Sequence, residues 1–149
     1  MTSSRILHLT AAASVAALLL LPSLAGCAAA EAALQQEASH EFATHDELVK
    51  GWKREAPWVP ADAESIRIRE SLAGEPASLA VVSESDLATD LCAEVERKSA
   101  PTIVLEKTPD VYKIDRVFAC GDWAVVETDD GWYGWTPVHP DERAASPAG

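Results

Sequence analysis

The sequence predicts an α+β protein, a small domain on a mainly antiparallel sheet with two short helices and a C-terminal three-stranded meander. The main observation is the stretch Val117–Pro137, VFACGDWAVVETDDGWYGWTP, which contains three of the five tryptophans. Its apolar runs are separated by two turn signals, Gly121-Asp122 and Asp129-Asp130-Gly131. Glycine accepts the positive φ that tight hairpin turns require, so we expect three consecutive antiparallel strands here.

Shorter patterns predict the elements that precede this stretch. Thr44 and Glu47 fit a capping box, with Thr44 as the N-cap, and start a predicted helix over 45–54. A second short helix is predicted from a cap at Ser83–Asp86 through Cys92. Alternating or short apolar runs predict three further strands, over residues 65–70, 78–82 and 102–105.

The N-terminal region has the order of an export signal. Arg5 supplies a positive charge, and Leu9–Leu24 is an almost wholly apolar run of about sixteen residues, which is short for a helix that spans a bilayer. We therefore predict four parts in the chain. They are a signal peptide at 1–26, a membrane tether at 27–40, a globular domain at 41–137 and a flexible tail at 138–149.

The four residues Leu24-Ala25-Gly26-Cys27 follow the apolar run directly and closely resemble the lipobox of bacterial lipoproteins. The resemblance implies that 1–26 is a lipoprotein signal peptide and that Cys27 becomes the mature N-terminus, with a diacylglyceryl group on its sulfur. It also implies a protein anchored to the cell membrane by acyl chains such as palmitate, at the extracytoplasmic face. Each buried methylene contributes about 0.8 kcal/mol, so two chains hold far better than one. The alternative is an ordinary cleaved signal followed by a chance cysteine.

The chain has three cysteines, and an exported protein meets an oxidising environment in which two of them should pair. The lipobox resemblance assigns Cys27 to the anchor, which leaves Cys92 and Cys120 as the predicted disulfide. Closing that loop should contribute about 3–4 kcal/mol in the chain-entropy model, which matters for a domain of this size.

The charge of the chain narrows the choice of partners. There are 24 acidic and 12 basic residues, and removal of 1–26 takes away only Arg5, so the net charge changes from −12 to −13. Such a surface repels nucleic-acid phosphates and anionic lipid headgroups. We therefore predict no nucleic-acid partner, and contact with the membrane through the lipid anchor.

The residue types that support catalysis do not converge in the sequence. His40, His45 and His139 lie in the predicted tether, the first helical turn and the tail, where the flanks orient a side chain poorly. There is no G-x-S-x-G, no S-x-x-K and no glycine-rich phosphate loop, and the acidic residues at Asp129-Asp130 lack the order of a calcium loop. We predict no enzyme, no catalytic residues, no metal and no cofactor.

The densest aromatic group is Trp132, Tyr133 and Trp135. Because side chains alternate along a strand, Trp132 and Trp135 should lie on opposite faces. We predict that one tryptophan enters the core and that another, with Tyr133, is exposed as a contact surface. The alternative is that a small sheet uses all of these rings in its core. The segment 121–135 is also similar to bacterial Src-homology-3-like cell-wall modules, a resemblance that implies contact with the cell wall.

Together these patterns predict a membrane-anchored envelope lipoprotein whose domain is a non-enzymatic binding or interaction module, with an envelope protein as partner. The first alternative is a module that binds cell-wall glycan through exposed aromatic rings. The second is an envelope hydrolase with an unrecognised site. Clustered exposed aromatics favour both binding interpretations, the interaction module and the glycan-binding module, and a pocket that joins a histidine to a carboxylate and a serine favours the hydrolase.

Overall fold

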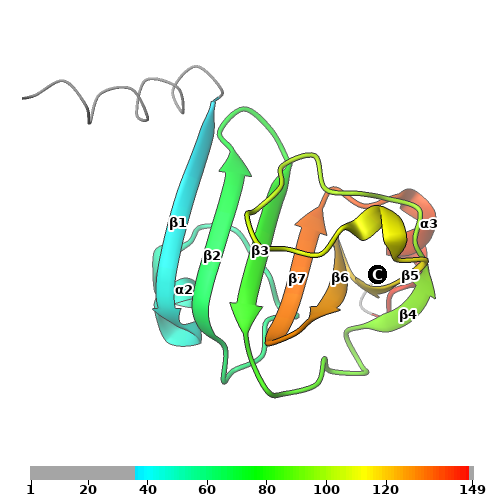
Figure 1. Ribbon diagram of the computed structural model, residues 1–149, viewed down its shortest axis with the longest axis horizontal. Coiled ribbons are helices and arrows are strands. Elements are labelled where there is room, and N and C mark those ends of the chain that lie inside the picture. The colour runs from blue at the N-terminus through cyan, green and yellow to red at the C-terminus, as the bar shows by residue number, and fades with distance from the viewer. Residues whose placement is uncertain (1–35, 148–149) are drawn as a thin grey trace, which may run out of the picture.

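Seven strands form one sheet in the computed structural model, which describes residues 36–147. Their order across the sheet is β1-β2-β3-β7-β6-β5-β4, and each strand is antiparallel to its neighbours (Figure 1). The strands are β1 (Glu37–Thr44), β2 (Glu64–Ser71), β3 (Ala77–Val82), β4 (Ala93–Glu96), β5 (Arg116–Cys120), β6 (Trp123–Thr128) and β7 (Gly131–Thr136). The predicted mainly antiparallel sheet is confirmed, and the domain around it is mostly β. The predictions for the signal peptide and for Cys27 lie outside the described residues.

The sheet consists of two groups of strands that meet at β7. The first three strands pair in chain order, and the last three also pair in chain order, from β5 to β6 to β7. β7 then pairs with β3, with Trp132 opposite Val81 and Trp135 opposite Ser78. This places the last strand of the chain at the centre of the sheet, and leaves β1 and β4 as its two edges.

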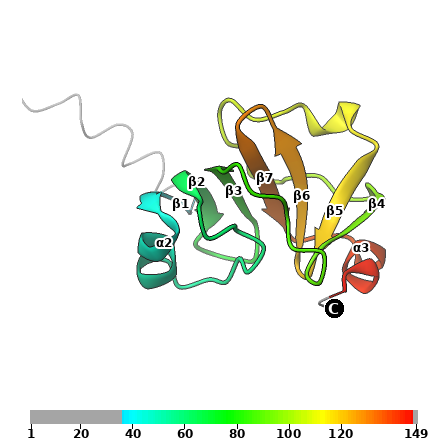
Figure 2. The same ribbon diagram turned by 90° about the horizontal axis from the view of Figure 1, so that it is seen from below.

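The sheet packs against other segments on both faces (Figure 2). Helix α2 (His45–Gly51) and the segment 52–63 lie on one face, and the connection 97–115, which contains the short 3-10 helix η1 (Val111–Lys113), lies on the other. The core on the α2 side includes Leu48, Trp52, Trp58, Ile66, Ile68, Leu79, Val125 and Trp132. The core on the connection side contains Ala80, Val111, Val117, Ala124, Val126, Tyr133 and Trp135. The sheet therefore has two cores, one on each face.

The predicted disulfide Cys92–Cys120 is present, with Cα atoms 4.3 Å apart. It joins the residue before β4 to the last residue of β5, beside the Ala93–Ala119 pair of the ladder. The bridge spans 28 residues, and both cysteines are buried. It therefore ties the loop that leaves β3 to the edge of the sheet.

Two predicted elements between β3 and β5 are wrong. Residues 83–92 form no helix but a turn-rich loop, in which Leu91 and Cys92 both donate backbone hydrogen bonds to the Ala88 carbonyl. Residues 102–105 form no strand, because they cross over a face of the sheet instead of joining an edge. The Ile103 carbonyl there accepts the Ser78 hydroxyl in place of a ladder hydrogen bond.

Both predicted boundaries of the domain also need correction. β1 begins at Glu37, inside the stretch predicted as a tether, and α2 ends at Gly51, earlier than predicted, although Thr44 is its N-cap as expected. The stretch predicted as a flexible tail contains helix α3 (Pro140–Ala145).

Helix α3 is held by a buried glutamate. The Glu142 carboxylate accepts hydrogen bonds from the amides of Lys98 (2.6 Å) and Ser99 (3.0 Å) on one oxygen and from the amide of His139 (3.0 Å) on the other. Burial alone would raise the pKa of the Glu142 carboxyl, but the hydrogen bonds from Ser99, Lys98 and His139 outweigh it and hold that pKa below its usual value. The helix thereby fixes the start of the connection 97–115.

Replacing the two turn glycines of the C-terminal strands by alanine should destabilise the fold to different extents. Gly121 has a φ of 63°, and an added Cβ would meet nothing within 4 Å, whereas at Gly131 (φ 158°) it would lie 2.3 Å from the Val81 carbonyl oxygen. We expect Gly121→Ala to lower the free energy of unfolding by about 1–2 kcal/mol, from backbone strain alone. Gly131→Ala should cost more than about 3 kcal/mol, because overpacking adds to strain. Urea unfolding measures the free energy of unfolding of both variants. Equal decreases for the two would contradict a steric clash between a side chain at position 131 and the Val81 carbonyl oxygen.

The Glu142 carboxylate should make stability depend on acid pH. Its pKa is lower in the folded than in the unfolded chain, so its contribution is present above the unfolded pKa and disappears as pH falls through the folded one. We expect Glu142→Gln to lower the free energy of unfolding by about 1.5–3 kcal/mol at pH 7, because it removes charge-assisted hydrogen bonds. The difference from wild type should shrink at pH 3. Glu127→Gln, which changes an exposed carboxylate of β6, is the control and should show no such convergence.

Candidate functional site

The predicted aromatic contact surface is buried, so that prediction is wrong. Trp132 is 8% exposed, and Tyr133 and Trp135 are 0% exposed. Their polar atoms are satisfied inside the protein, because Trp132 Nε1 donates to the Ser85 carbonyl (2.9 Å) and Trp135 Nε1 donates to Ser99 Oγ (3.0 Å). The cause is the central position of β7, which is covered on both faces. The interaction module and the glycan-binding alternative both lose the sequence observation on which they were based.

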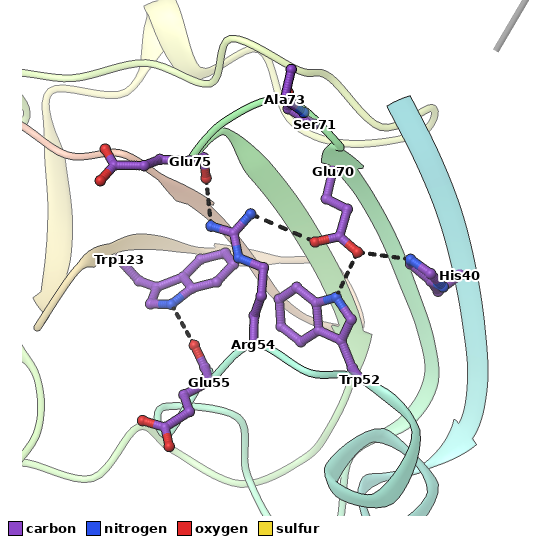
Figure 3. Close-up of polar contacts among 9 residues, drawn as sticks. All are labelled: His40, Trp52, Arg54, Glu55, Glu70, Ser71, Ala73, Glu75 and Trp123. Carbon is purple, nitrogen blue, oxygen red and sulfur yellow. Dashed lines mark hydrogen bonds and ion pairs between the residues drawn. The ribbon is translucent and has the colours of Figure 1, made fainter. Parts of the chain in front are cut away.

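A second candidate is the cluster around the Glu70 carboxylate in β2 (Figure 3). One oxygen of Glu70 accepts hydrogen bonds from His40 Nε2 (2.8 Å) and Trp52 Nε1 (3.0 Å), and the other lies 3.6 Å from the Arg54 guanidinium. Arg54 also donates to the Glu75 carbonyl, and its guanidinium carbon lies 5.9 Å from the centre of the Trp52 ring. Three segments of the chain therefore converge on a single carboxylate.

The partners of Glu70 explain this cluster as a structural clamp. They join edge strand β1, through His40, to the segment that follows α2, through Trp52 and Arg54. The side chain of Glu70 is only 13% exposed, and both of its oxygens are occupied. Within residues 36–147 the cluster contains no serine placed on the histidine, which is the group that a hydrolase of this kind would need. The geometry does not favour the hydrolase.

The third candidate is a groove on the half of the sheet that the connection 97–115 leaves uncovered. In Figure 1 that connection (yellow-green to yellow) passes in front of β3 and β7, beside the open faces of β1 and β2. The groove has a volume of about 660 Å³. It is lined by residues 41–43 of β1, 65–67 of β2 and 80–82 of β3, by residues 106–108 of the connection, and by Thr128 and Asp130.

The walls of the groove carry charges of both signs. Arg67 Nη1 donates to the Glu106 carbonyl (2.9 Å), which fixes the connection to β2 along one wall. Lys107 takes a left-handed conformation, with a φ of 59°, and is exposed, as is Glu41 on the opposite wall. Among residues 36–147 neither of these two charges forms an ion pair, so both are available to a ligand. Of the three candidates, only this groove presents charged groups that are not already paired.

Within the described part of the chain, no group of three or more histidine, cysteine or acidic side chains is arranged to hold a metal ion. The acidic residues considered in the sequence lie apart or are paired, since Asp122 contacts Arg143 at 2.7 Å and Asp130 accepts the Thr128 hydroxyl at 3.1 Å. No helix in residues 36–147 is long and apolar enough to cross a membrane. Protein-family models, curated proteins and solved structures yield no match to this chain.

Sequence reasoning did not find the groove. A partial signal was present in β2, where Ile66 and Ile68 alternate with Arg67 and Arg69 and so place two cations on one face. Nothing local indicated that residues 106–108 would lie beside that face, because the contact depends on the path of the whole connection.

Proposed function

We propose that this chain is a lipid-anchored protein of the cell envelope, held at the extracytoplasmic face of the cell membrane through Cys27. The proposal of an anchor rests on the sequence Leu24-Ala25-Gly26-Cys27 directly after an apolar run. A second observation is compatible with export, because a buried disulfide such as Cys92–Cys120 persists in oxidising compartments.

The folded domain is, in this proposal, a non-catalytic interaction module that binds another envelope protein. The observation that carries this step is the uncovered half of the sheet, where the groove presents Glu41 and Lys107 without partners among residues 36–147. This half of the sheet differs from the part over β5, β6 and β7, where the same face is apolar and packs against the connection 97–115. Polar, concave and solvent-accessible surfaces of this kind suit specific contacts with a partner.

If Cys27 carries the lipid anchor, replacing this one cysteine should abolish acylation of the protein. Cys27→Ala should abolish incorporation of an alkyne-tagged palmitate and should leave uncleaved precursor or release protein into the medium, because the acylated sulfur is removed. Fractionation and mass measurement of the N-terminus follow both effects. A Cys92→Ala, Cys120→Ala double variant is the control and should keep the label. A Cys27→Ala protein that is still labelled, cleaved and membrane-bound would contradict the anchor.

The groove predicts where a partner can be captured. A photo-activatable phenylalanine analogue at Lys107 should cross-link to an envelope protein in intact cells, because position 107 lies in the groove wall. The same analogue at Tyr112, which is 74% exposed on the same connection but outside the groove, is the matched control. Gel shifts after irradiation, followed by mass spectrometry, measure the adducts. No adduct at 107, or equal adducts at both positions, would refute the groove as the binding region.

A further inference from the structure

The outer edge of β1 has no partner strand in the described part of the chain. β1 is the first strand of the sheet order, and its residues 37–42 and Thr44 pair with β2, whereas Ala43 has no partner in this ladder. It contains no proline and no bulge, which are the features that usually block a sheet edge. The opposite edge, β4, is only four residues long. β1 is therefore the longer of the two edges.

Three hydrogen bonds fix which backbone groups of β1 point outward. The Gln36 carbonyl accepts from the Leu72 amide (2.6 Å) on the β2 side, whereas the Ala43 amide donates to the Glu47 carboxylate (2.9 Å) and not to β2. In β2, the Ser71 amide donates toward β3, to the Pro76 carbonyl (2.8 Å). Because the backbone alternates with a period of two, even-numbered residues of β1 bond to β2. The amides and carbonyls of Ser39 and Glu41 therefore face outward.

The side chains beside this edge differ between the two faces of the sheet. Ser39 and Glu41 are exposed on the uncovered face, and Glu41 also lines the groove. On the other face His40 and Phe42 are stacked, with ring centres 6.3 Å apart and planes 12° from parallel. A strand added to β1 would thus meet a carboxylate on one face and a pair of aromatic rings on the other.

We propose that β1 binds an extended segment of a partner protein as an additional antiparallel strand of the sheet. The segment carries basic side chains on the face of Glu41 and aliphatic or aromatic side chains on the face of His40 and Phe42. This inference rests on the proposed interaction module and names the chemistry of its partner. The backbone hydrogen bonds supply affinity and the alternating side chains supply specificity, as in other cases of strand addition.

Charge favours a basic partner over a second copy of this chain. A second copy would bring its own Glu41 to the shared edge, and like charges placed opposite each other across strands are destabilising. Glu37 contributes less, because its carboxylate is paired with Arg69 at 2.7 Å. The chain's net charge of −12, or −13 without residues 1–26, adds a repulsion over longer range. The Glu41 carboxylate attracts lysine and arginine side chains, so it disfavours self-association and favours a complementary strand.

The test uses the full chain, purified from its host in mild detergent, and a capped nonapeptide of alternating lysine and valine with a fluorescent label. We expect anisotropy to show binding to wild type and to Ser39→Ala. Ser39→Pro should bind at least about ten-fold more weakly, because proline removes an outward amide and its ring obstructs the added strand. Its melting temperature should stay near that of Ser39→Ala, since the Ser39 amide does not bond to β2.

A pair of modified peptides tests the same geometry without changing the protein. Residues opposite Ser39 and Glu41 carry their side chains on the same face as Glu41, so the lysine amides should face β1. N-methylation of the central lysine should abolish binding, and N-methylation of a neighbouring valine should not. A peptide that alternates glutamate and valine should bind more weakly than the lysine peptide. The Glu41→Gln variant should show a smaller difference in affinity between these two peptides.

Several outcomes would overturn the inference. They are the absence of peptide binding, equal binding of the two N-methylated peptides, and a stable Ser39→Pro variant that binds like wild type. A dimer in sedimentation that Ser39→Pro dissociates would identify a second copy as the occupant, against the proposal. Cross-linking from Lys107 is a separate readout. If it captures a partner while the peptide results fail, the interaction module stands and the strand addition does not.

Discussion

The fold depends on burying β7 from both sides. All six residues of Gly131–Thr136 are buried, so alternate side chains must enter two different cores. Trp132 packs with the tryptophans on the α2 side, whereas Tyr133 and Trp135 pack under the connection 97–115. Gly134 leaves room for the first of these cores, since a Cβ there would lie 2.6 Å from Trp58 Cζ2. Neither covering segment can be removed without exposing large aromatic surface to water.

The two covering segments do not reach equally far, and this difference leaves a face of β1 and β2 exposed, with Glu41 among its charged groups. The core on the α2 side extends from Phe42 of β1 to Phe118 of β5, but the connection 97–115 reaches no further than β3 and the Arg67 side chain of β2. It is fixed there by Ser78 Oγ, which donates to the Ile103 carbonyl, and by Arg67, which donates to the Glu106 carbonyl. The groove lies at this boundary. The position of the groove therefore follows from where the connection 97–115 ends its packing against the sheet.

Local signals in the sequence predicted those parts of the fold that depend on neighbouring residues. The cap at Thr44, the alternation in β2 and the turn glycines are of this kind, and Cys92–Cys120 followed from cysteine number together with the lipobox. The burial of Trp132, Tyr133 and Trp135 was not predictable, because a strand with one solvated face has the same local pattern as one with two covered faces. β1 was missed since Phe42 is its only large apolar residue, and α3 because its anchor is a buried glutamate.

The edge strand β1 combines internal restraint with an accessible outer side. The hydrogen bond from His40 to Glu70 holds β1 against β2 and the segment after α2. Because β1 is already ordered, binding of a partner strand would cost little conformational entropy on this side. In the proposed anchored state the acidic surface repels anionic headgroups, which would keep the domain off the lipid surface. The same charge that would keep the edge free of lipid therefore favours a basic protein segment.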